Sequence, residues 1–177
     1  MTPGDRLGFV GFIVGGLAAA LMGMIPLAQA ILWLTMPVAI VIWGLSVRQF
    51  LTRIPPAPLR PMLDIHLAPA MLFASVAALT GQGMLAHGMM AFATVILLGL
   101  LARLRWLTQT GFSPMWGTFT FPPVAYAGAG LILGGAWAVT GGIALMAALG
   151  VVPTIAYRVL KLWPAGTLAA RTNAAEA

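Results

Sequence analysis

The sequence predicts an all-α membrane protein with six transmembrane helices that form three hairpins. The first observation behind this fold class is composition, since 61% of the 177 residues are hydrophobic and only 7% are charged. Soluble domains carry about 25% charged residues on average, so a mean hydropathy of +1.01 excludes an ordinary water-soluble globule. The second observation is a series of six apolar runs of roughly 20 residues, the length that crosses a bilayer.

The six runs follow one another along the chain, joined by links of different lengths. The first, third and fifth are expected to be inner helices, and the second, fourth and sixth to be outer helices that face lipid. Residues 1–163 are therefore predicted to form a single transmembrane domain, and residues 164–177 a short, mobile cytoplasmic tail. In chain order the predicted spans are 7–27, 30–50, 63–82, 85–106, 114–140 and 143–163.

Basic residues give the expected orientation of the helices. The links that follow the first, third and fifth spans are short and carry no Lys or Arg, so all nine basic residues fall on the other side. Cytoplasmic links of membrane proteins collect Lys and Arg, which predicts a multi-pass membrane protein with both termini in the cytoplasm. The membrane is expected to be a bacterial inner membrane. The net charge of +6 is therefore attributed to topology and not to nucleic-acid binding. The nine residues are Arg6, Arg48, Arg53, Arg60, Arg103, Arg105, Arg158, Lys161 and Arg171.

Faces of small residues distinguish the expected inner helices. Two explanations fit them: close packing of helices in lipid, or an inner layer around a path through the membrane. Pro69, Pro122 and Pro123 favour the path, because a proline inside a helix frees a carbonyl that must be satisfied or line a cavity. The residues expected to line the path are Gly11, Gly15, Ser75, Gly117, Ala125 and Gly128.

Few ionisable side chains lie within the apolar runs. Asp64 follows Arg60 by four residues, a spacing that fits an ion pair on a helix, and a helix-terminus interaction is equally simple. His66 is interpreted as a packed or interfacial residue. The alternative for Asp64 and His66 is a proton relay. No metal-ligand spacing, nucleophile–base pair or phosphate-binding loop occurs, so no enzyme, metal or cofactor is expected.

The expected lining also indicates what could pass along the path. Glycine, alanine, threonine and phenylalanine provide no fixed acid that would hold a cation. Arg53, Arg60 and Arg105 are expected to surround the cytoplasmic mouth and to attract anions. Such a lining suits a small anion that binds weakly enough to leave again.

Two segments resemble motifs of the tellurite-resistance/dicarboxylate transporter family, which includes bacterial tellurite-resistance proteins and plant slow anion channels. Residues 59–70, LRPMLDIHLAPA, resemble the segment that begins an inner helix of that family. Residues 112–122, FSPMWGTFTFP, resemble a later motif that ends in Tyr-Thr-Phe-Pro. The two segments occur in the family's order, with one outer helix between them.

The resemblance implies a specific architecture and gate. Family members have ten helices in five hairpins around a central pore, with the odd-numbered helices inside, and are commonly trimers. The six spans of this chain match the last three hairpins, and the family's pore-blocking phenylalanine falls on Phe121. Because two hairpins have no counterpart, we expect either a shortened homo-oligomeric member or a partner chain that supplies the missing helices.

Three functions remain open from the sequence. The first is a channel or exporter for small anions with Phe121 as its gate. The second is a non-conducting scaffold or accessory subunit that kept the fold. The third is a proton-coupled dicarboxylate carrier, which would need Asp64 or His66 as a relay.

Overall fold

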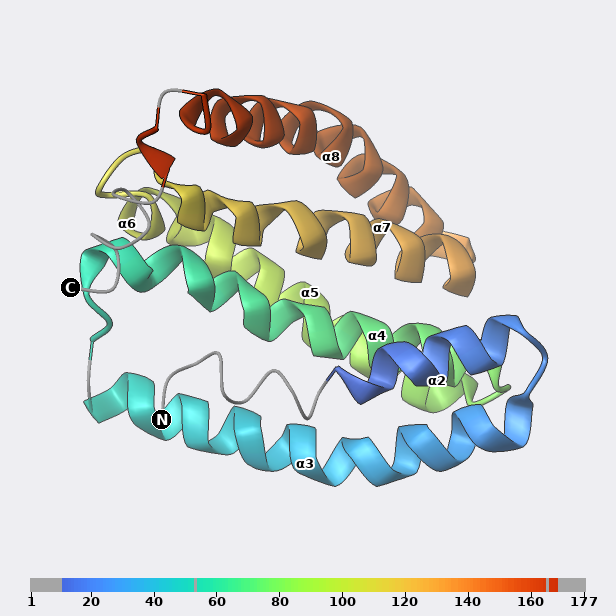
Figure 1. Ribbon diagram of the computed structural model, residues 1–177. Coiled ribbons are helices and arrows are strands. Elements are labelled where there is room, and N and C mark those ends of the chain that lie inside the picture. Colours follow the sequence, from blue (N-terminus) through green and yellow to red (C-terminus); the bar gives the residue numbers. More distant parts are fainter. Residues whose placement is uncertain (1–10, 53, 165, 169–177) are drawn as a thin grey trace.

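The computed structural model describes residues 11–52, 54–164 and 166–168, and all regular secondary structure in these ranges is helical (Figure 1). This confirms the all-α class. The α-helices are α2 (Phe12–Leu21), α3 (Ile25–Thr52), α4 (Leu67–Leu79), α5 (Gly83–Ala102), α6 (Leu104–Leu107), α7 (Phe121–Leu133) and α8 (Gly135–Leu162). Two 3₁₀ helices, η2 (Ala57–His66) and η3 (Pro114–Thr120), lead directly into α4 and α7.

Four helices in the described ranges are long and apolar enough to cross a membrane. They cover Ile25–Arg48, Ala57–Leu79, Gly83–Ala102 and Gly135–Leu162. The other two predicted spans correspond to α2 and α7, which have 10 and 13 residues, fewer than the roughly 20 that a spanning helix needs. The chain therefore has the composition and helix lengths of an integral membrane protein at four of the six predicted positions.

The central helix is α4. It packs against α2, α3, α5 and α7, and Figure 1 shows it between α3 and α7. In the most apolar stretch of the span Ala57–Leu79, 67% of the residues are buried, against 17% in α5 and 17% in α8. Helices α5 and α8 thus leave most of their apolar surface uncovered by the described residues, which is compatible with helices that face lipid.

Trp43 of α3 ties three helices together near this centre. Its indole N–H donates a hydrogen bond to the backbone carbonyl oxygen of His66, with an N···O distance of 3.3 Å. Its ring meets Phe73 and Phe92 edge-on, at centroid distances of 6.2 and 4.9 Å, an arrangement that aromatic rings prefer. Trp43 is therefore a packing residue and not part of an interfacial aromatic belt.

Two predicted helix boundaries are wrong, and glycine explains both. The chain turns at Gly23 (φ 76°), so α3 already begins at Ile25, five residues before the predicted start. It turns again at Gly134 (φ 73°), so the predicted span 114–140 ends at Leu133. Only glycine adopts such φ values at little cost. Apolar residues continue through both turns, so hydropathy alone does not reveal them.

Helices α7 and α8 approach each other closely because of two glycines. A Cβ atom at Gly130 would lie 2.6 Å from the carbonyl oxygen of Trp137 and 2.9 Å from the Cα atom of Gly141. Gly141, which the sequence places in the link between two spans, is instead buried within α8. On this face the small residues serve helix packing.

Candidate functional site

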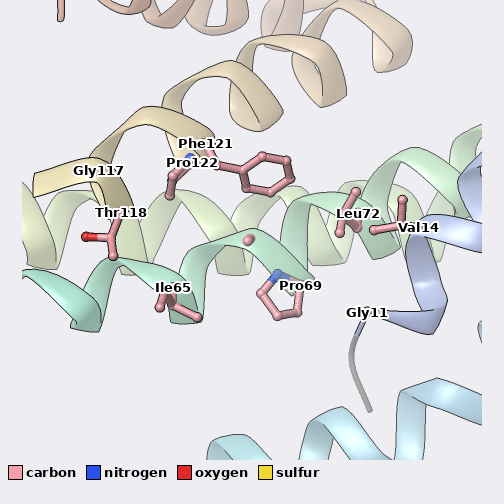
Figure 2. A pocket seen from close by; sticks show the side chains of 10 residues that line it. Gly11, Val14, Ile65, Pro69, Leu72, Gly117, Thr118, Phe121 and Pro122 are labelled. Atoms are coloured by element: carbon pink, nitrogen blue, oxygen red, sulfur yellow. The ribbon is translucent and has the colours of Figure 1, made fainter. Parts of the chain in front are cut away.

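A partly open groove of about 260 Å³ lies where three segments of the chain meet. One wall comes from α2, the floor from η2 and α4, and the other wall from η3 and α7 (Figure 2). These segments belong to the three spans that the sequence predicts to be inner helices. The groove is lined by Gly11, Val14, Ile65, Ala68, Pro69, Leu72, Gly117, Thr118, Phe121 and Pro122.

Phe121 is the largest side chain of the groove. It is the first residue of α7, and Figure 2 shows its ring extending from the helix start along the groove. The side chain is 50% exposed, so it is not a buried core residue of the described structure. A ring in this position narrows the groove without being fixed by close packing on every side.

The prolines next to the groove start helices and do not kink them, which corrects the sequence interpretation. Pro122 and Pro123 are the second and third residues of α7, and Pro69 is the third residue of α4. The first backbone N–H groups of an α-helix have no partner within the helix, so proline is tolerated there. The preceding carbonyls belong to the 3₁₀ segments η2 and η3.

Only part of the predicted lining reaches this groove. Gly11 and Gly117 line it, as expected. Ser75 does not, because it is buried and its hydroxyl donates a hydrogen bond to the carbonyl oxygen of Met71, 2.9 Å away. Ser75 is therefore satisfied within its own helix.

The remaining predicted lining residues also lie elsewhere. Ala125 packs against the cluster around Tyr126. Gly15 and Gly128 border open space, since a Cβ atom at either position would meet nothing within 4 Å, but neither lines the groove. Together with Gly117 they form a set of small residues that no helix of the described ranges covers.

The sequence missed several lining residues because it assumed continuous α-helices. A 3₁₀ helix has three residues per turn and an α-helix 3.6, so the 3₁₀ segment η2 changes which side chains share a face. Ile65 and Ala68 line the groove, whereas Asp64, which a continuous α-helix would place on the face of Ala68, is buried with 6% of its surface exposed. The signal in the sequence for such a non-α start was proline: four prolines lie within residues 55–61, before α4, and Pro114 begins the segment before α7.

The groove is apolar, and its polar group is already engaged. The hydroxyl of Thr118 lies 2.8 Å from the carbonyl oxygen of Pro61 and 2.9 Å from that of Met115, and its single hydrogen is shared between these two acceptors. The contact with Pro61 ties η3 to η2. It also joins the two sequence segments that resemble family motifs, which are 57 residues apart at this point.

The expected ion pair between Asp64 and Arg60 does not form. The guanidinium of Arg60 instead donates from Nε to the carbonyl oxygen of Pro55, at 3.2 Å, and from Nη1 to Oε1 of Gln109, at 2.5 Å. It also lies over the ring of Trp106, 4.3 Å from the centroid. Arg60 therefore fastens η2 to the segment after α5 and does not line the groove.

The other charged candidates that the structure describes, Arg105 and His66, do not line the groove. Arg105 is exposed on α6, and Arg53 lies outside the described residues. His66 contributes its backbone carbonyl to the Trp43 contact. Within the described residues no group of three His, Cys, Asp or Glu side chains could hold a metal ion.

Comparisons of the chain with protein-family models, with curated proteins and with solved structures give no match.

Proposed function

We propose that the protein is a channel- or exporter-like transporter for small anions, similar to the tellurite-resistance/dicarboxylate transporter family, and that the groove is part of its path. The observation that carries the proposal is the composition of the groove: all three segments predicted as inner helices meet there, and Phe121 projects into it. The contact between Thr118 and Pro61 adds support, since it brings both motif segments together.

The proposal includes six membrane spans with both termini in the cytoplasm. Three turns, at Gly23, Gly81 and Gly134, each join a pair of packed helices. In Figure 1 these turns lie at one end of the molecule, and the ends of α3, α6 and α8, which carry most of the described basic residues, lie at the other. Under this proposal α2 and α7 complete the six spans, with η3 extending α7.

The chemistry of the groove favours an anion over a cation. No lining residue carries a charge, so no carboxylate would hold a cation. Arg105 lies on α6, and other described basic residues lie on the ends of α3 and α8, where they attract anions without binding them inside the groove. No covalent chemistry is required of the chain.

The groove is open along one side, so a closed path requires further helices. A second copy of this chain, in a trimer, or a different partner chain would supply them. A non-conducting scaffold is the competing function, and it is favoured by the same open side. A proton-coupled carrier that uses Asp64 is a weaker candidate, because Asp64 does not line the groove.

The test is anion flux into liposomes that contain the complete assembly. Phe121→Ala removes the ring that narrows the groove and should increase flux. Because the side chain is half-exposed, the free energy of unfolding should fall by only about 1 kcal/mol, less than for a fully buried phenylalanine. The matched control is Phe12→Ala, which removes another exposed ring, one that does not line the groove. Equal flux in the wild type and in both variants would favour the scaffold.

The six spans are tested separately by cysteine labelling, for which the cysteine-free chain is well suited. Single cysteines at Met22, Met84 and Ala136, all exposed and close to the three turns, should react with a membrane-impermeant maleimide added outside the cell. A cysteine at Thr110, at the opposite end, should react only after the membrane is opened. Any other pattern contradicts the proposed topology.

A further inference from the structure

Arg60 of η2 is held in place by three neighbours. Pro55 accepts a hydrogen bond from Nε, Gln109 accepts one from Nη1, and Trp106 covers one face of the guanidinium. The side chain is partly buried. Its position is therefore fixed before any ligand binds, which lowers the entropy that a ligand must overcome.

Most of the hydrogen-bonding capacity of this guanidinium is unused. Arginine has five N–H donors, and two of them are engaged with Pro55 and Gln109. The other three have no acceptor among the described residues. The planar fork of such donors matches the oxygens of a phosphate group.

Among the described residues, no carboxylate compensates the charge of Arg60. Asp64 is the only acidic residue in the described ranges, and it does not pair with Arg60. A partly buried cation without a carboxylate partner favours an anion from outside the chain. Trp106 indicates where that anion lies, because tryptophan prefers the level of the lipid headgroups in membrane proteins.

We propose that Arg60, positioned by Pro55, Trp106 and Gln109, binds a phosphate anion at the membrane surface. Two sources share this chemistry, the headgroup of an anionic phospholipid and free phosphate, and basic pockets between membrane helices bind the former. The inference goes beyond anion transport. It requires that the chain lies in a bilayer but does not require that the groove conducts.

The experiment is native mass spectrometry of the detergent-purified protein, titrated with phosphatidylglycerol and, as the phosphate-free comparison, with diacylglycerol. Wild-type protein should bind phosphatidylglycerol in preference. Arg60→Gln should weaken that binding about tenfold or more, the loss expected for hydrogen bonds to a charged group. Arg103→Gln removes the same charge from an exposed residue nearby and should change the affinity by less than about twofold.

A second variant tests the site without removing Arg60. Gln109→Glu places a carboxylate next to the guanidinium of Arg60, where it would compete with phosphate. This variant should weaken phosphate binding about as strongly as Arg60→Gln. Thr110→Glu adds the same charge one residue away, at an exposed position, and serves as its control. Because Gln109 is exposed, this variant should keep the helix content of the wild type even if Arg60→Gln fails to fold.

The outcomes distinguish a phospholipid headgroup from free phosphate as the ligand, and they can contradict the proposed binding site. If excess inorganic phosphate leaves phosphatidylglycerol bound, the ligand is the lipid headgroup, and if it displaces the lipid, the site takes free phosphate. The site is wrong if Gln109→Glu binds phosphatidylglycerol as the wild type does, or if Thr110→Glu weakens binding equally. Neither result depends on anion flux, so failure of this site and failure of the transport proposal are distinguishable.

Discussion

The segment η3–α7 carries glycine on two faces, one of which packs closely against α8 while the other is uncovered. Toward α8, Gly130 leaves no space, since an added Cβ atom would lie 2.6 Å from the carbonyl oxygen of Trp137. On its uncovered side, Gly117 and Gly128 have open space, and a Cβ atom at either would meet nothing within 4 Å. Small residues therefore mark helix packing on the first face and an uncovered surface on the second. Glycine content alone does not distinguish the two.

The largest effect expected from this comparison is that of Gly130→Ala. The new Cβ atom would contact backbone atoms of α8, which cannot rotate away as a side chain could. The two helices must separate, and overpacking of this kind costs about 3 kcal/mol, at the upper end of the usual range. Thermal unfolding of the purified protein in detergent, followed by circular dichroism, measures the loss.

The matched control for Gly130→Ala is Gly128→Ala, in the same helix. With open space at Gly128, alanine should not lower the unfolding temperature, and its greater helix propensity favours a small increase. Equal losses at both positions would show that the two faces of α7 do not differ as described.

A smaller effect is expected on the buried side of α7, where a hydrogen bond joins α7 to α5. The hydroxyls of Tyr126 and Thr94 lie 2.8 Å apart. Because the Thr94 hydroxyl already donates to the carbonyl oxygen of Met90, the tyrosine is the donor. Hydrogen bonds between membrane helices contribute about 0.6 kcal/mol on average, so Tyr126→Phe should lower the free energy of unfolding by about that amount.

A double-mutant cycle isolates this hydrogen bond. Thr94→Ala should cost a similar amount, and the double variant should cost less than the sum of the two single variants. Strict additivity would mean that the contact between the hydroxyls contributes nothing to stability.

How far the sequence predicts this molecule depends on which feature is considered. Composition and apolar runs predict the all-α class and the four long helices, because a chain that crosses a bilayer by helices needs both. They do not predict the turns at Gly23 and Gly134, where apolar residues continue through the turn. They also miss the effect of η2, whose 3₁₀ geometry directs Ile65 instead of Asp64 toward the groove.

The candidate site, too, was predicted from the sequence only in part. Gly11 and Gly117 were predicted to line the path and Phe121 to be its gate, and all three line the groove. The assignment of Gly15, Ser75, Ala125 and Gly128 needs the relative rotation of the helices, which sequence periodicity gives only within one continuous helix. The contacts of Arg60 join residues up to 49 positions apart, and no local pattern encodes them.

The smallest effect on stability, and the sharpest test of the uncovered face, is expected at Gly117. Alanine there meets no atom within 4 Å, so Gly117→Ala should change the free energy of unfolding by less than about 0.5 kcal/mol, as for a surface substitution. Gly117→Leu should also be tolerated, because its side chain extends into the groove and not into the protein. If the groove is the anion path, this leucine should lower flux in the liposome assay, the opposite of the effect of Phe121→Ala. A stable leucine variant with unchanged flux would leave the groove as a surface that other helices cover and would exclude it as a path.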